Sequence, residues 1–339
     1  MKRKTKYAPV AVILGTALLH LLGCGKQTSG DSVTPNQANA NTTKSEYVFA
    51  LIAKSQSNPV FESARYGAED AAEAIGKELG VKITVLWQTP NEADAQKQVQ
   101  YVDQLSLQGV DGISISCSEA ATLTPAIDRA VQKGIAVMCF DSDAPKSKRF
   151  CYFGTDDNGC GHTIMRELAK VLGPGHHIVA IPGGDQNSLN IQNRIKGAID
   201  EATNYPNITI RGVYYSKEVP QDAAAVAEQV QNTNPDIDGW AMVGSWALFT
   251  DALLTWQPGK VKIVAMDALP AELPYLQKGI VQELWAQQTY QWGWQSVELM
   301  AQKVIQGKNP PVIVYSPLIP VGETNVDEFA TNWKKWLHE

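Results

Sequence analysis

Strand-like and helix-like segments alternate along the chain from Glu46 onward, and this alternation constrains the fold more than any other feature. The apolar run at residues 47–53 has the length and the aromatic content of a buried strand. After it, Phe61, Ala64 and Ala68 recur every three or four positions, which places them on one face of a helix. Strands that alternate with helices at this spacing predict parallel sheets covered by helices on both faces.

The alternation forms two successive series, and each has enough strands for a sheet of its own. The first series predicts strands near residues 47–53, 81–87, 110–116, 135–140 and 151–154. The second predicts strands near residues 177–181, 208–214, 239–243, 261–266 and 280–285. The helices expected between and after them include those near residues 246–256 and 290–305, and a strand is expected at 312–315. The predicted fold class is α/β with two doubly wound lobes, and 339 residues suit two domains of roughly 150 residues each.

The first 23 residues have the composition of an export signal. Basic residues precede an apolar stretch at residues 8–22, which is shorter than the ~20 residues of a membrane-spanning helix and has the length of a signal-peptide core. The stretch ends in Leu-Leu-Gly-Cys, which is similar to a bacterial lipobox, where the peptide is cut before the cysteine and the thiol takes a diacylglycerol. We therefore expect residues 1–23 to be a lipoprotein signal peptide and Cys24 to be the lipidation site.

Residues 24–45 contain almost no large apolar side chain, so we expect a flexible tether after the lipidated cysteine. The folded body would then be exported and anchored on the periplasmic or cell-surface side of a membrane. Its four cysteines suit an oxidising compartment, but three pairings are possible and free buried thiols are an alternative. These cysteines are Cys117, Cys139, Cys151 and Cys160.

Charge and motifs exclude several classes of protein. The chain has 29 basic and 35 acidic side chains and a formal charge of −6, whereas a nucleic-acid binder carries a basic face. A transcription regulator would need a basic helix-turn-helix where this chain has its signal and tether. The sequence has no nucleophile elbow, HExxH pair or phosphate loop with its lysine, and no zinc-site spacing. We expect no nucleic-acid partner, no enzymatic activity, no cofactor and no metal.

In doubly wound sheets, ligands bind beyond the carboxyl ends of the strands, so the residues just after each strand are the candidates for a site. Here those residues are mainly carboxylates, amides, hydroxyls and aromatic rings. Carboxylates and amides pair with adjacent hydroxyl groups, and a flat ring packs on the C–H face of a sugar. The strand ends therefore favour a polyhydroxylated ligand.

Several short motifs occur in order at these strand ends. They are Asn58-Pro59-x-Phe61, Phe140-Asp141, the GTDDNG segment at 154–159, Arg194-x-x-Gly197, Ala265-Met266-Asp267 and Ala286-Gln287. Together, over about residues 46–326, they make the chain resemble the periplasmic sugar-binding proteins of the ribose-binding type. Those proteins have the type I periplasmic binding protein fold and are the solute receptors of ABC importers.

The resemblance implies roles for particular side chains. Those expected to hydrogen-bond sugar hydroxyls from the two lobes are Asn58, Asp141, Asp267 and Gln287. Phe61 would stack on the sugar ring. Further candidates for ligand contact are Ser142, Gln192, Arg194 and Trp246.

The chain departs from the ribose binders at several of these positions. Val60 stands where they have a second aromatic ring, and Ser142 and Gln192 stand about where they have arginines. The loss of two arginines and the presence of Trp246 indicate a pocket adapted to a sugar other than ribose.

Structural roles are the alternative for some of these residues. Asp141 and Asp267 could be turn formers or helix N-caps. Phe61 could belong to the core of a helix, Arg194 could brace its lobe, and Trp246 could pack at an interface.

In the family, the chain crosses between the lobes three times, which predicts a three-segment hinge near residues 154–156, 286–288 and 315–318. The N-terminal lobe would comprise residues 46–155 and 288–316, and the C-terminal lobe residues 156–287 and 317–339. Such lobes close on their ligand by bending at the hinge.

The resemblance implies a lipid-anchored solute receptor, working as a monomer, that delivers a monosaccharide or related polyol to the permease of an ABC importer. The alternative is a sugar or autoinducer sensor of the same fold that signals to a chemoreceptor or a sensor kinase.

Overall fold

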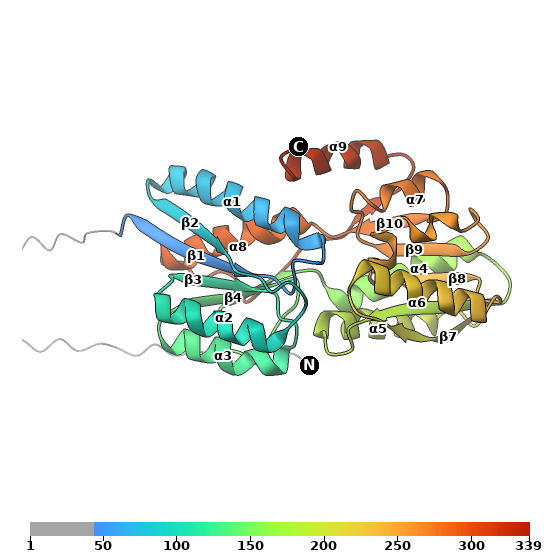
Figure 1. Cartoon of the computed structure of the whole chain (residues 1–339), viewed down its shortest axis with the longest axis horizontal. Helices are drawn as coiled ribbons and strands as arrows, with labels where there is room; N and C mark the ends of the chain where they lie inside the picture. The colour runs from blue at the N-terminus through green and yellow to red at the C-terminus, as the bar shows by residue number, and fades with distance from the viewer. Residues whose placement is uncertain (1–43) are drawn as a thin grey trace, which may run out of the picture. The chain divides into compact units, whose positions relative to one another are not determined.

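The computed structural model describes residues 44–339, which form two lobes, each built on one sheet (Figure 1). In spatial order, the N-lobe sheet contains β11 (Ile313–Tyr315), β5 (Cys151–Gly154), β4 (Ala136–Phe140), β3 (Gly112–Ile115), β1 (Glu46–Ile52) and β2 (Lys82–Trp87). The C-lobe sheet contains β12 (Ile319–Val321), β10 (Glu283–Ala286), β9 (Lys262–Met266), β8 (Gly239–Met242), β6 (His177–Gly184) and β7 (Ile208–Tyr215). The predicted fold class is confirmed.

Helices cover both faces of the N-lobe sheet. They are α1 (Val60–Leu79) and α8 (Thr289–Val304) on one face, and α2 (Ala95–Gln108) and α3 (Ala120–Gln132) on the other. Phe49 and Leu51 of β1 pack with α1 and α8, whereas Ala50 and Ile52 pack with α2 and α3. Because both faces of β1 are buried, the strand is a continuous apolar run rather than an alternating one. Strand β1 could be predicted from the sequence because of this apolar run.

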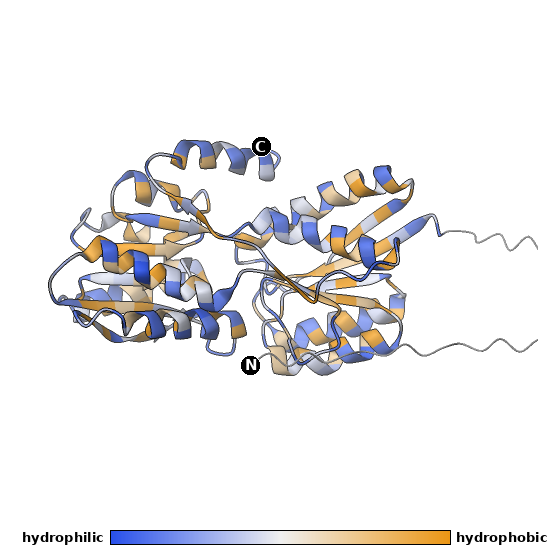
Figure 2. Ribbon diagram, turned by 180° about the vertical axis from the view of Figure 1, so that it is seen from behind, coloured by the Kyte–Doolittle hydropathy of each residue, from blue (hydrophilic) through white to orange (hydrophobic). Residues whose placement is uncertain are grey.

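The C-lobe uses the same kinds of contact. Its elements are the paired helices α4 (Asp157–Leu172) and α5 (Leu189–Ala202), the helix α6 (Pro220–Thr233), the short helices η1 (Trp246–Leu248), η2 (Ala252–Thr255) and α7 (Leu273–Gln277), and the last helix α9 (Val326–Trp336). In both lobes the strands are mostly hydrophobic, while the helices carry hydrophobic and hydrophilic residues side by side (Figure 2). This colouring is what amphipathic helices around buried sheets produce.

The strand β12 is antiparallel to β10, although the other strand pairs of both sheets are parallel. Only residues 316–318 separate β11 from β12. Because β11 leaves the N-lobe sheet at the carboxyl ends of its strands and the chain enters the C-lobe sheet at the carboxyl ends of its strands, β12 runs antiparallel to β10.

The prediction of one helix over residues 246–256 is wrong. Two short 3₁₀ helices stand there instead, η1 and η2, because the Thr250 hydroxyl accepts a hydrogen bond from the backbone N–H of Ala252 at 3.2 Å. Trp246 is also held from outside the segment, since a Cβ built on Gly184 at the end of β6 would lie 2.5 Å from its ring. Tertiary packing therefore overrides the helical spacing of the sequence.

The main chain passes between the sheets at three places. Residues 155–156 link β5 to α4, residues 287–288 link β10 to α8, and residues 316–318 link β11 to β12. Each lobe is therefore made of segments that are far apart in the sequence.

The last helix, α9, contacts both lobes, which the sequence did not predict. In the C-lobe, the indole N–H of Trp333 donates a hydrogen bond to the carbonyl of Ala268 at 2.7 Å. Just beyond α9, Nε2 of His338 lies 3.0 Å from a carboxylate oxygen of Asp70 on α1 of the N-lobe. In Figure 1 this helix lies above α7 and runs toward α1.

Close helix pairs in both lobes depend on glycine. In the N-lobe, a Cβ on Gly293 of α8 would lie 1.7 Å from the carbonyl oxygen of Ala64 on α1. In the C-lobe, a Cβ on Gly161 of α4 would lie 1.9 Å from the carbonyl oxygen of Arg194 on α5. No other residue lets these backbones approach so closely, because the obstacle is main chain and cannot swing away.

We predict that Gly293→Ala lowers the free energy of unfolding by about 3 kcal/mol or more, because α8 must shift off α1 to admit the methyl group. Chemical denaturation of residues 44–339 measures this loss. The control is Gly322→Ala, since a Cβ there has no neighbour within 4 Å. Equal stability of Gly293→Ala and the unaltered chain would contradict the packing described here.

Candidate ligand-binding site

A small cavity lies where the carboxyl ends of the two sheets face each other. It is lined by residues that follow β1 and β4 in the N-lobe and β7, β8, β9 and β10 in the C-lobe, together with the start of α5. Its volume is about 20 Å³, which is room for about one water molecule. A monosaccharide fits only after the lobes separate or the lining side chains move.

Seven of the nine ligand-contact residues expected from the sequence line this cavity. They are Asn58, Phe61, Asp141, Arg194, Trp246, Asp267 and Gln287. The structure therefore brings together side chains from six strand ends or helix starts in two lobes.

The two carboxylates occupy matching positions in the two lobes. Asp141 directly follows β4 and Asp267 directly follows β9, and both are buried. Both have a left-handed backbone, with φ of 55° and 66°, which is rare for a residue other than glycine. Such strain is typical of functional positions, where surrounding contacts fix a side chain in one direction.

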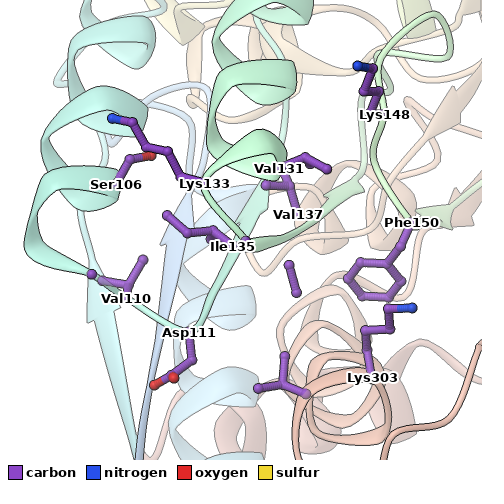
Figure 3. A pocket seen from close by; sticks show the side chains of 14 residues that line it. Ser106, Val110, Asp111, Val131, Lys133, Ile135, Val137, Lys148, Phe150 and Lys303 are labelled. Carbon is purple, nitrogen blue, oxygen red and sulfur yellow. The ribbon is translucent and has the colours of Figure 1, made fainter.

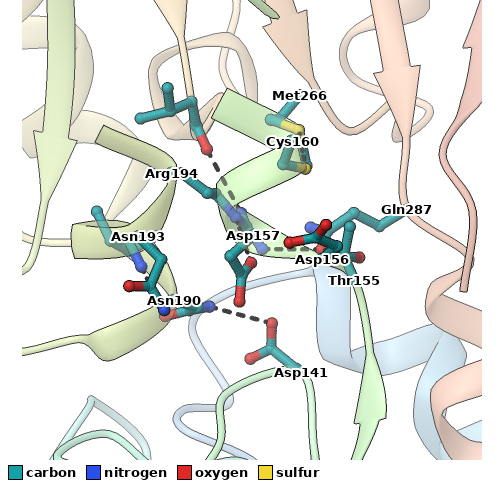
Figure 4. A network of polar contacts seen from close by, with 12 residues as sticks. Asp141, Thr155, Asp156, Asp157, Cys160, Asn190, Asn193, Arg194, Met266 and Gln287 are labelled. Atoms are coloured by element: carbon teal, nitrogen blue, oxygen red, sulfur yellow. Dashed lines mark hydrogen bonds and ion pairs between the residues drawn. The ribbon is translucent and has the colours of Figure 1, made fainter. Parts of the chain in front are cut away.

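Each of these carboxylates accepts hydrogen bonds from its own lobe. The Ser116 hydroxyl donates to Asp141 at 2.6 Å, and the Gln287 amide donates to Asp267 at 2.8 Å. Asp141 also accepts a hydrogen bond of 3.3 Å from the Asn190 amide, which comes from the other lobe (Figure 4).

Arg194 is the centre of the polar network in Figure 4. From α5, its Nε donates to Asp157 at 2.8 Å and its Nη2 donates to the side-chain oxygen of Gln287 at 2.8 Å. Its Nη1 lies 3.4 Å from the carbonyl oxygen of Val243. Burial alone would lower the pKa of Arg194, but Asp157 and other nearby carboxylates outweigh it, so that pKa is raised.

Two carboxylates of the site have raised pKa values. Burial raises the pKa of Asp157 to about 6, although Arg194 opposes this shift. Burial also raises the pKa of Asp267, again against Arg194 and the amide of Gln287. The cause is the same in both: charging a carboxyl group away from water costs free energy, and the hydrogen-bond and charge partners offset only part of that cost.

Aromatic rings come from both lobes. Phe61 lies 5.9 Å from the ring of Trp292 and 6.3 Å from that of Phe140, so it belongs to a buried aromatic cluster as well as to the cavity wall. On the C-lobe side, the Trp246 ring lies against Gly184 and Gly244, where a Cβ would approach it within 2.5 and 2.1 Å. The cavity therefore has an aromatic face in each lobe.

Ser142 and Gln192 do not line the cavity, so their expected place in the site is not supported. Ser142 is fully buried in the turn after β4, where its backbone N–H donates to the carbonyl of Phe140. Gln192 is exposed on α5, and its amide donates to the carbonyl of Gln186. Gln192 lies two positions from Arg194 on one helix, and such positions point in different directions.

Four polar or aromatic lining residues were not among the expected ligand contacts: Lys54, Asn190, Glu218 and Trp292. The ammonium group of Lys54 crosses between the lobes, donating to Asn190 Oδ1 at 3.0 Å and to the Ser188 hydroxyl at 3.3 Å. It also lies 3.8 Å from Glu218 Oε2. Lys54 follows β1 and Glu218 follows β7, so a stricter reading of every strand end would have found both.

A wider hollow of about 660 Å³ lies at the opposite end of the N-lobe sheet (Figure 3). Asp111 and Ile135, which precede β3 and β4, are among its lining residues, as are Lys133, Lys148 and Lys303. Because ligands of such sheets bind at the carboxyl ends of the strands, this amino-end hollow is not the candidate site.

The four cysteines of the body are buried free thiols, and Sγ of Cys117 lies 3.9 Å from Sγ of Cys139. Residues 44–339 contain no group of three or more His, Cys, Asp or Glu side chains arranged to hold a metal ion. Within the same part of the chain, no helix has both the length and the apolar character needed to cross a membrane.

The model of the periplasmic binding protein domain matches residues 49–309 of this chain. The chain belongs to this family. Its members are solute-binding receptors, which confirms the expectation of a binding protein rather than an enzyme.

Several relatives of this chain are sugar-binding proteins. The D-ribose/D-allose-binding protein of Pseudomonas aeruginosa is 26% identical over 272 residues, which cover 77% of this chain and 83% of the relative. The D-allose-binding periplasmic protein of Escherichia coli is 26% identical over 278 residues, covering 78% and 86%. An ABC-transporter solute-binding protein from Burkholderia graminis, solved in complex with D-arabinose, has a TM-score of 0.77 at 28% identity and covers 84% of this chain and 97% of its own. The resemblance to the ribose type is thus confirmed.

We predict that Asp157 makes stability depend on pH between its ordinary pKa of 3.8 and its folded value of about 6. In that window the folded protein keeps a proton that the unfolded chain has released, so the free energy of unfolding falls as pH rises. Asp157→Asn removes this contribution, and its stability relative to the unaltered chain should rise across the window and then level off.

Thermal unfolding of both proteins from pH 4 to 8 without sugar measures the difference. Asp156→Asn is the control, because it removes an exposed carboxyl one residue away. A stability difference between Asp157→Asn and the unaltered chain that does not change with pH would contradict the prediction.

Proposed function

We propose that this protein is a lipid-anchored solute receptor that binds a monosaccharide or a related polyol between its lobes and delivers it to an ABC importer permease. The observation that carries the proposal is the pair of strained, buried carboxylates Asp141 and Asp267, which line one cavity from opposite lobes. A polyhydroxylated ligand offers hydrogen-bond donors to both carboxylates at once. The aromatic rings of Phe61 and Trp246 supply the apolar walls that the C–H faces of a sugar prefer.

The proposed mechanism is closure of the lobes around the ligand. Lys54 and Asn190 already join the lobes through a hydrogen bond of 3.0 Å, and Asn190 donates a second one to Asp141. A sugar that contacts both carboxylates binds only when the lobes are together, so it favours the closed arrangement. The permease would then recognise the surface that closure brings together.

The relatives suggest where the search for the ligand should begin. Their names and structures concern D-ribose, D-allose and D-arabinose, all neutral sugars. Val60, which stands where the ribose binders have a second aromatic ring, lines the cavity together with Trp246, so we propose a neutral sugar other than ribose.

The anchor is proposed from the sequence, because the signal peptide and Cys24 lie outside the described residues. Cys24→Ser should abolish incorporation of labelled fatty acid into the protein, since the thiol that carries the lipid is gone. Cys117→Ser, which alters a buried thiol of the body, is the control. Equal labelling of Cys24→Ser and the unaltered chain would contradict lipid anchoring at this residue.

We predict that Asp141→Ala and Asp267→Ala each weaken sugar binding by about tenfold or more, because each leaves sugar hydroxyls buried without an acceptor. A thermal-shift screen of D-allose, D-arabinose, D-ribose, D-glucose, D-galactose and xylitol first identifies a ligand, and calorimetric titration then gives the dissociation constants. Asp251→Ala, which removes an exposed carboxylate of the C-lobe, is the control.

Each outcome bears on a different part of the proposal. If the unaltered chain binds one sugar tightly and both variants bind it equally tightly, the carboxylates are wrongly assigned. If the protein binds a sugar but its deletion leaves cellular uptake of that sugar unchanged, delivery to an importer is refuted.

A further inference from the structure

We propose that Glu218 determines ligand specificity by accepting a hydrogen bond from one particular sugar hydroxyl beside Lys54. The site would then select an unmodified hydroxyl at that position over a hydrogen, an amine or a carboxylate. This inference rests on the proposed function and adds the chemistry of one subsite to it.

Glu218 has a buried acceptor that the protein itself leaves unused. The side chain is 9% exposed and lines the cavity from the segment between β7 and α6. Its Oε1 atom has no hydrogen-bond partner among residues 44–339. A buried carboxylate oxygen without a donor is costly, and because Glu218 lines the cavity, we infer that the ligand carries the missing donor.

Lys54 provides a donor beside this acceptor. An ammonium group has three N–H donors, and two of them reach Asn190 Oδ1 and the Ser188 hydroxyl. The Nζ atom lies 3.8 Å from Glu218 Oε2, which is an ion pair but too long for a hydrogen bond. One donor and one acceptor therefore stand side by side at this corner of the cavity.

A hydroxyl group matches that corner better than any other common sugar substituent. It donates to Glu218 and accepts from Lys54 in the same position. An ammonium group cannot accept and would face the charge of Lys54, while a carboxylate would face the charge of Glu218. A hydrogen in place of the hydroxyl leaves the buried groups unpaired, which is how binding sites reject deoxy analogues strongly.

The other carboxylates of the site differ from Glu218 in this respect. Asp141 accepts from the Ser116 hydroxyl, and Asp267 accepts from the Gln287 amide, so both are oriented by the protein. Glu218 instead lies between the cavity and a neighbouring hollow of about 170 Å³, which Ser57 of the N-lobe also lines. A ligand hydroxyl at this corner would fix Glu218 at the boundary between the lobes.

The test is a coupling experiment by calorimetric titration on the purified full chain. The probes are D-allose, D-arabinose, D-ribose, D-glucose and D-galactose, together with the monodeoxy, amino and uronic acid derivatives of whichever of them binds. The variants are Glu218→Ala and Glu218→Gln. The control is Glu92→Gln, which alters an exposed carboxylate lining the neighbouring hollow but not the cavity.

We expect Glu218→Ala to weaken binding of the parent sugar by about 100-fold and to leave binding of one monodeoxy derivative almost unchanged. The other monodeoxy derivatives should lose affinity in Glu218→Ala as the parent does. Glu218→Gln keeps an acceptor oxygen, so its affinity for the parent sugar should lie between those of the unaltered chain and Glu218→Ala. Amino and uronic acid derivatives at the same position should bind the unaltered chain more weakly than the parent, and Glu92→Gln should change none of these values.

Three results would overturn the inference while the proposed function stands. The first is that Glu218→Ala binds the parent sugar as tightly as the unaltered chain does. The second is that Glu218→Ala loses the same affinity for the parent and for every monodeoxy derivative. The third is that the unaltered chain binds an amino or uronic acid derivative more tightly than the parent. If none of the probes binds the unaltered chain, the proposed function fails first and this inference falls with it. Thermal unfolding of Glu218→Ala establishes that any loss of affinity occurs in a folded protein.

Discussion

The buried guanidinium group of Arg194 is the interaction on which the rest of the site depends. Removing an ion from water is expensive, and only good partners repay it. Arg194 obtains those partners from three separate segments: Asp157 at the start of α4, the carbonyl of Val243 after β8, and Gln287 in the link between the lobes. The orientation of the Gln287 amide follows, because its oxygen faces Arg194 and its N–H₂ group therefore faces Asp267.

The two lobes contain matching arrangements of residues at the site. In each, a parallel strand ends in an aspartate with a left-handed backbone, Asp141 or Asp267, and a serine hydroxyl close by, Ser116 or Ser245, lies within 3.4 Å of it. Each lobe also contains a helix pair in contact through glycine. Two similar half-sites that face each other are the arrangement that the proposed closure of the lobes on a ligand requires.

The corner formed by Lys54 and Glu218 lies outside the motifs that carry the family resemblance. The motifs include Asn58 and Asp141, whereas these two charges stand at strand ends that no motif marks. Their partnership across the lobes exists only because β1 and β7 belong to different sheets and end at the same cavity. A specificity device of this kind can change without altering the fold.

The sequence by itself determined the two-lobed α/β class, because buried strands and amphipathic helices have different periods that a single chain displays openly. It also predicted seven of the cavity-lining residues, since the motifs behind the family resemblance lie mostly at the carboxyl ends of strands in both sheets. Only the tertiary structure decided the rest. Local spacing predicted a helix at residues 246–256, but the contacts of Trp246 and the Thr250 hydroxyl divide it into η1 and η2. Likewise, Gln192 and Arg194 are two residues apart on α5, and the direction of each side chain, toward solvent or toward the cavity, depends on how the helix packs rather than on which residues it contains.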